Sequence, residues 1–114
     1  MERQKNSDIT VEAKFTGVPL EHLPDFVFQF YTELHQSETY TCSKTGGNYV
    51  NCVASEPEVK PPGWGTVVRC IIENHNFKPG RLCVLAHIKW VDPDFEDGIN
   101  NEIVRKKLEL VIKP

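Results

Sequence analysis

The chain of 114 residues is long enough for one domain with a single buried core, held together without disulfides or metal. Charged residues make up 25% of the chain and apolar residues 39%, proportions that argue against wholesale disorder. The net charge of -3, with no face that concentrates Lys and Arg, argues against a general nucleic-acid binder.

No stretch approaches the roughly 18 apolar residues of a membrane span. The polar residues 1–8 also lack the apolar region of a signal peptide. We therefore expect a cytoplasmic location at synthesis and no membrane contact. Residues 1–8 are predicted to be a disordered tail, and residues 9–114 a single domain.

Alternating apolar and polar residues predict strands throughout the chain. The second of these strands carries Phe26, Phe28 and Phe30 on one face, where we expect them to pack in a core. Residues 20–24 form either a loop or one helical turn. The predicted strands are residues 9–15, 26–33, 39–44, 48–53, 66–72, 82–90 and 107–112. About seven strands without an amphipathic helix favour an all-β fold, an antiparallel β-sandwich of immunoglobulin-like or jelly-roll-like type.

A central hairpin is expected from residues 66–72 and 82–90, which flank a turn-rich joint at residues 74–81. In the joint Pro79 fixes its own φ and Gly80 tolerates a positive φ, so these two residues favour a type II turn there. This turn is predicted to join two antiparallel strands.

A second hairpin is expected around Gly46 and Gly47, which connect residues 39–44 to residues 48–53. Primed turns need positive φ, and glycine provides it. Residues 55–65, rich in Pro and Gly, are predicted to be a surface loop, and so are residues 92–98.

The four cysteines, Cys42, Cys52, Cys70 and Cys83, contain no C-x-x-C pair and match zinc-site templates poorly. Each lies in a predicted strand, so buried free thiols are expected. The alternative is a Cys70–Cys83 bridge, because the two would lie nearly opposite each other in the central hairpin. A reducing cytosol disfavours that bridge.

Asp92, Asp94 and Asp97 offer oxygen ligands at short spacing, as calcium requires, but the twelve-residue EF-hand pattern is absent. The alternative is a turn in which the Asp side chains accept hydrogen bonds from backbone amides. Both interpretations remain open from the sequence.

The four histidines lie on different predicted elements, so a metal site would need a coincidence of the fold. His87 is predicted to be exposed on its strand, and His75 to hydrogen-bond the backbone of the joint. The other two histidines are His22 and His35.

The basic residues 105–107 are interpreted as a solvated cluster at the start of a strand.

No motif of an enzyme is present. A G-x-S-x-G elbow and a cysteine-protease signature are both absent, and residues 45–48 lack the Lys of a phosphate-binding loop. Carboxylate pairs such as Glu33 with Glu102 are inevitable among sixteen acidic residues. The sequence therefore predicts no catalytic, cofactor-binding or metal-binding residue, and a protein that is not an enzyme.

Four segments, residues 25–32, 40–52, 74–82 and 93–98, together resemble the small β-sandwich domain near the start of prophage-encoded structural proteins of gut bacteria. They are also similar in outline to the N-terminal domain of phage baseplate upper proteins. The resemblance covers residues 15–112 and consists of turn and strand signatures.

The resemblance implies an assembly module that joins a tail or baseplate to a fibre or receptor-binding part. Its partners would be other phage structural proteins, with a homo-oligomer possible and the virion as final location. No catalytic residue comes with the resemblance. Related proteins tend to continue into long helical or fibre regions, so a sequence ending at Pro114 is expected to be an excised domain or a free-standing version.

The leading hypothesis is therefore a non-enzymatic structural and interaction module, and the alternative is a carbohydrate-binding module. The alternative would use exposed aromatic side chains, namely Trp64, Trp90, Tyr31 and Tyr49. For the leading hypothesis, the candidate contact residues come mainly from the loops: Trp64, His75, Phe77, Arg81 and Phe95.

Overall fold

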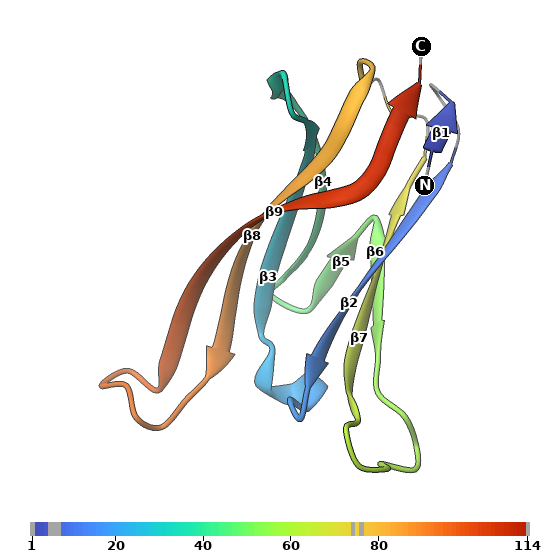
Figure 1. Ribbon diagram of the computed structural model, residues 1–114. Coiled ribbons are helices and arrows are strands. Elements are labelled where there is room, and N and C mark those ends of the chain that lie inside the picture. Colours follow the sequence, from blue (N-terminus) through green and yellow to red (C-terminus); the bar gives the residue numbers. More distant parts are fainter. Residues whose placement is uncertain (1, 5–7, 74, 76, 114) are drawn as a thin grey trace.

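Two β-sheets stacked face to face build the fold in a computed structural model that describes residues 2–4, 8–73, 75 and 77–113 (Figure 1). One sheet has the strand order β1-β9-β8-β3-β4-β5, and the other has the order β2-β7-β6. The strands are β1 (Glu2–Gln4), β2 (Ile9–Thr16), β3 (Asp25–Thr32), β4 (His35–Thr45), β5 (Asn48–Val50), β6 (Cys52–Ser55), β7 (Gly65–Ile72), β8 (Gly80–Val91) and β9 (Ile99–Lys113). The predicted antiparallel β-sandwich is confirmed, although β1 pairs with β9 in parallel.

The core lies between the two sheets, where alternate side chains of each strand point inwards. Phe26, Phe28 and Phe30 of β3 are almost fully buried, which confirms their predicted role. Burying one such side chain contributes roughly 1.5–3 kcal/mol. Their inward neighbours on β8 are Ile88, Ala86 and Val84, and β7 adds Val68, Cys70 and Ile72 to the same cluster.

β7 and β8 do not form the predicted central hairpin. β7 pairs with β2 and β6 in the three-stranded sheet, whereas β8 pairs with β3 and β9 in the other sheet. Both strands have an apolar face, and opposite sheets allow these two faces to pack on each other across the core. The chain after β7 therefore crosses between the sheets instead of turning back.

Gly80, predicted to lie in a tight turn, is the first residue of β8 and pairs with Ile112 of β9. Its φ of 146° confirms the expected positive φ, but in a strand rather than in a hairpin turn. Two further residues of the predicted joint, Asn74 and Asn76, lie outside the described residues.

The second predicted hairpin is confirmed as far as Val50. β4 and β5 pair in antiparallel around Gly46 and Gly47, whose φ values of 57° and 84° fit a primed turn. Asn51 then adopts a φ of 56° and ends the pairing. The next residues form β6 in the other sheet, so the single predicted strand at 48–53 is two strands.

β9 is far longer than the predicted strand at residues 107–112, because it begins at Ile99. From Ile99 to Lys107 every residue is exposed or only half-buried. An alternating pattern needs one buried face, so the sequence contained no such signal for this half of the strand.

The chain ends and connections agree only in part with the predictions. Glu2–Gln4 form β1 beside the end of β9, so this part of residues 1–8 is a strand rather than a disordered tail. The loops after β6 and β8 are confirmed, and Leu20–His22 form one 3₁₀ turn, which decides between the two alternatives left open there. The described residues contain no helix with the length and apolar character needed to cross a bilayer.

Candidate interaction surfaces

Two of the predicted contact residues are buried and lie on no surface. His75 and Phe77 are 1% and 3% exposed, and their rings pack with centroids 4.8 Å apart. The backbone N–H of Phe77 donates to Nδ1 of His75 over 3.3 Å, which confirms the predicted side-chain to backbone bond. The prediction that His75 and Phe77 form an interface is therefore wrong, because both side chains are buried within the chain.

Arg81 is exposed, but its guanidinium already has a role in the fold. Nε donates to the carbonyl oxygen of Leu108 over 2.8 Å. The register between β8 and β9 shifts between Arg81 and Cys83, and residues 108–110 of β9 bulge there. The predicted contact residue Arg81 thus supports this irregularity in β9.

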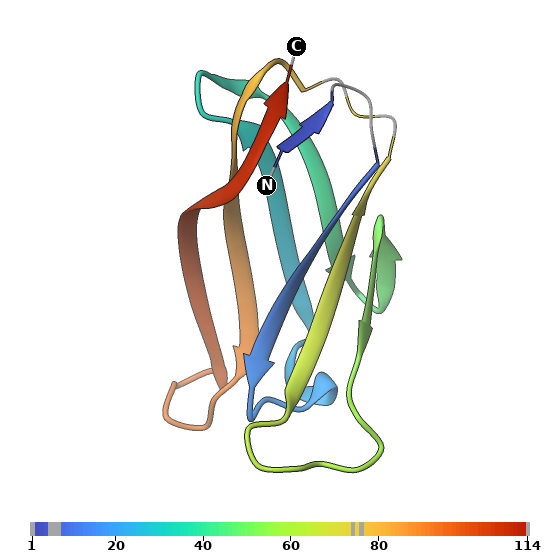
Figure 2. The same cartoon turned by 45° about the vertical axis from the view of Figure 1, so that its right-hand side comes forward.

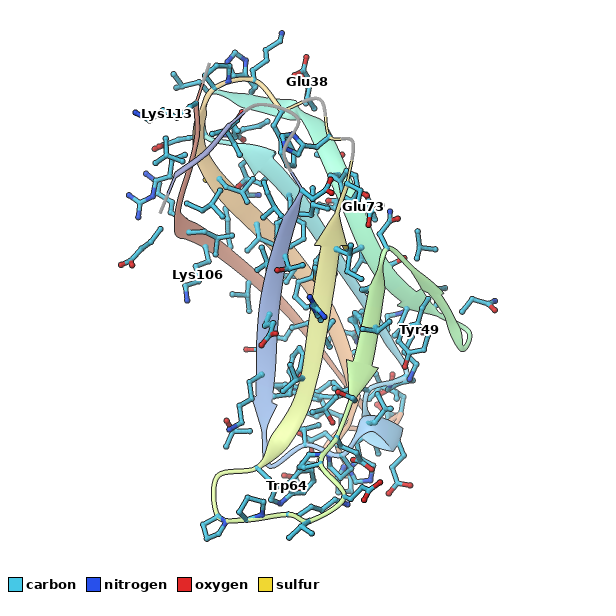
Figure 3. All side chains as sticks on the ribbon, turned by 90° about the vertical axis from the view of Figure 1, so that its right-hand side faces the viewer. Glu38, Tyr49, Trp64, Glu73, Lys106 and Lys113 are labelled. Atoms are coloured by element: carbon cyan, nitrogen blue, oxygen red, sulfur yellow. The ribbon has the colours of Figure 1, made fainter. Side chains whose placement is uncertain are left out.

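Trp64 lies at the end of the long loop that precedes β7 (Figure 3). Its ring is half-buried, and the ammonium of Lys60 lies 4.8 Å from the ring centroid. Its carbonyl oxygen accepts a 2.7 Å hydrogen bond from the backbone N–H of Gly17. Trp64 is therefore held by contacts from two other segments, and its side chain stays partly accessible.

Phe95 lies at the tip of the loop between β8 and β9 and is 47% exposed. The Asp side chains beside it accept backbone hydrogen bonds: Asp92 from Asp94 over 3.1 Å, and Asp97 from Ile99 over 3.0 Å. These bonds confirm the predicted capping turn. Within the described residues no three His, Cys, Asp or Glu side chains are arranged to hold a metal ion.

Three of the four cysteines meet inside the core where the sheets face each other. Cys52 of β6 lies directly opposite Cys70 of β7, and Cys70 shares a hydrogen bond with Cys42 of β4. This bond lowers the pKa of Cys42 and raises that of Cys70, which burial raises further. Burial likewise raises the pKa of Cys52.

All four cysteines are buried free thiols, as predicted. Cys83 lies on β8 between the core residues Leu82 and Val84, so its side chain points to the outer face of the six-stranded sheet. Cys70 faces the core from the other sheet, so the alternative of a Cys70–Cys83 bridge is wrong. The sequence could not place the cluster, since the three thiols come from strands of two different sheets that face each other only in the folded chain.

Basic side chains of β9 border a shallow hollow of about 370 Å³ on the outer face of the six-stranded sheet. Nζ of Lys107 lies 2.6 Å from Oε1 of Glu33, the residue that follows β3. The hydrogen bond from Lys107, and its charge, hold the pKa of Glu33 below the usual range. The same pair raises the pKa of Lys107. The predicted solvated cluster at 105–107 therefore includes one ion pair.

The four aromatic residues of the carbohydrate-binding alternative do not share one face. Tyr31 is buried on the outer side of the six-stranded sheet, whereas Trp90 is half-buried on its inner side. Tyr49 and Trp64 lie at well-separated places in Figure 3, and a Lys ammonium lies near each ring. No open aromatic platform results from this arrangement.

Comparison of the chain with protein-family models, curated proteins and solved structures finds no match. The arrangement of its own residues is therefore what indicates where the chain makes contacts.

The first half of β9 is the surface that the sequence did not predict. Glu102, Val104 and Lys106 lie opposite the inward-facing Ile88, Ala86 and Val84 of β8, yet all three are exposed. The three-stranded sheet therefore does not cover this part of β9, and in Figure 1 the β8–β9 hairpin reaches away from that sheet at the lower left.

Two large apolar side chains are exposed on this uncovered segment: Ile103 is 67% exposed and Val104 40%. A β-branched pair between Glu102 and Arg105 was the only signal of it in the sequence. Solitary exposed apolar residues are ordinary on proteins, and these two point to opposite faces of the sheet, so each face of this segment carries one exposed apolar side chain.

Proposed function

We propose that the chain is a non-enzymatic structural and interaction module, a docking domain of a phage or prophage tail or baseplate. The observation that carries the proposal is the uncovered half of β9, with Ile103 and Val104 exposed beside a core made mainly of apolar side chains. The resemblance of the turn and strand signatures to phage structural domains supplies the particle assignment.

The polar groups near the hollow on the outer face do not favour catalysis. The hollow is shallow, and its acid and base, Glu33 and Lys107, neutralise each other in an ion pair. A general acid or base needs a pKa near the working pH, whereas this pair moves both pKa values away from neutrality. An interaction role needs only exposed contact groups on a rigid scaffold, and β9 provides them.

The experiment is to purify phage particles from the strain that encodes the chain and to probe them with an antibody against it. We expect the chain to co-purify with the particles and the antibody to label one end of the tail in electron micrographs. Genes for tail or baseplate proteins should flank its coding sequence. A chain absent from the particles, with unrelated flanking genes, would contradict the particle assignment.

A further inference from the structure

The outer edge of β9 is long enough to accept another strand. β1 pairs only with residues 111–113, so none of the described residues pairs with this edge between Ile99 and Leu110. An unpaired edge presents backbone N–H and C=O groups that can extend the sheet by one strand. Figure 2 shows this part of β9 at the left border of the six-stranded sheet.

The other sheet edges offer less. β5 and β6 have only three and four residues. β2 has eight, but its apolar side chains already pack against the core, and its fully exposed ones, such as Glu12 and Lys14, are polar. Residues 35–42 of β4 are also unpaired on the side of β5, but the fully exposed side chains there, such as Gln36 and Glu38, are polar. Among the described residues, only the edge of β9 combines a long unpaired backbone with exposed large apolar side chains, Ile103 and Val104.

The charge pattern along this edge is complementary to the same edge of a second copy in antiparallel orientation. In an antiparallel pair related by a two-fold axis through Val104, Glu102 of each copy lies opposite Lys106 of the other. Val104 then meets Val104, and Ile103 lies against the aliphatic stem of Arg105. Directly opposite side chains share one face of a sheet, and opposite charges there are favourable. No like charges face each other in this register.

The neighbouring symmetric registers are poorer. Two-fold symmetry about an axis normal to the sheet allows shifts of the axis by whole residues only, because facing side chains must lie on one face. An axis through Ile103 loses both Glu102–Lys106 pairs. An axis through Arg105 places two guanidinium groups opposite each other. The sequence of the edge therefore selects the register centred on Val104.

We propose that this edge pairs with the same edge of a second copy of the chain, so that two six-stranded sheets join into one through antiparallel β9 strands. The inference rests on the proposed role as an interaction module and names its first partner. The interface is isologous and closed, because each copy contributes the same segment, residues 101–107, to its partner. Lys on an edge strand ordinarily prevents pairing, and here Glu102 of the second copy neutralises Lys106.

The first measurement is the molar mass in solution, by sedimentation velocity and light scattering over a concentration series. A chain of 13.0 kDa should reach twice that mass as the concentration rises. A chain that stays monomeric throughout would overturn the self-pairing. A monomer would not contradict the assignment to phage particles, which the particle experiment tests independently.

Charge reversals test the register. Glu102→Lys and Lys106→Glu each place like charges opposite each other at both symmetric contacts, so each should weaken the dimer by about tenfold or more. The double variant, and an equimolar mixture of the two single variants, should both restore dimers. The interface would be overturned if the single variants dimerise as strongly as the unchanged chain, or if the mixture of the two forms no dimer.

Two controls separate folding from pairing. Leu34→Lys changes a side chain that is 85% exposed and distant in sequence from β9, and it should leave the dimer unchanged. Circular dichroism and melting of each variant show that the fold survives, which is expected because Glu102 and Lys106 are exposed. Weaker dimers in Leu34→Lys would count against the β9 edge as the interface.

Discussion

Gly65 lies where β7 comes close to the backbone of β2, and its replacement by alanine tests the packing of the smaller sheet. A Cβ atom there would lie 2.3 Å from the carbonyl oxygen of Phe15 and 2.8 Å from Cα of Thr16. Both are backbone atoms, so the clash cannot be relieved by the rotation of a side chain. Gly65→Ala must therefore push the ends of β2 and β7 apart.

The cost follows from the bonds that hold these ends together. The N–H of Gly17 donates to Trp64, and the N–H of Thr66 donates to Val18. Overpacking typically costs about 1–3 kcal/mol, and weakening these two hydrogen bonds without breaking them adds about 1 kcal/mol in total. We expect a loss of about 2–4 kcal/mol in the free energy of unfolding, and therefore a melting temperature lower by roughly 8–16 °C.

Urea unfolding followed by tryptophan fluorescence measures this loss, and Gly46→Ala is the matched control. Gly46 also has a positive φ, but no atom lies within 4 Å of its added Cβ, so only the conformational cost of about 1 kcal/mol applies. If Gly65→Ala costs no more than Gly46→Ala, the described contact between β2 and β7 is wrong.

Three further changes probe other parts of the fold. The pKa of Glu33 is lowered in the folded chain, so its ion pair with Lys107 stabilises the fold at pH values above the usual carboxyl pKa. Glu33→Gln should therefore lower the melting temperature at neutral pH. That difference should vanish as the pH falls through the lowered pKa of Glu33; a difference persisting in acid would argue against the pair. Asp97→Ala should cost about 0.5–1.5 kcal/mol in urea unfolding, since the N–H of Ile99 loses its acceptor, and an unchanged stability would contradict the capping turn. The four buried thiols should react with a thiol reagent only as fast as the chain opens, whereas immediate labelling of a folded chain would contradict their burial.

The alternating residues predicted which side chains face the core but not which strands pair. Phe26, Phe28 and Phe30 face inwards as expected, because period-two burial is a local property of one strand. Pairing depends on the partners available in the folded chain. The sequence placed β7 beside β8 since a turn-rich joint lies between them, whereas β2 and β3 are the better partners.

The residues of the candidate contact surface were predicted less well than the fold. Trp64 and Phe95 are partly exposed near the ends of the sandwich, as loop residues usually are. His75 and Phe77 are buried, because the Phe77 ring belongs to the core and the His75 ring packs against it. Ile103 and Val104 were missed, since a strand exposed on both faces has no alternation to reveal it.

The central claim is that the chain makes its contacts through the uncovered edge of β9. Hydrogen exchange of the backbone amides, measured by mass spectrometry on dilute and on concentrated protein, tests it most directly. The account predicts that exchange slows at high concentration in residues 101–107 and stays constant at the short edge formed by Asn48–Val50. Equal exchange of residues 101–107 at both concentrations, or slowing confined to another edge, would contradict it.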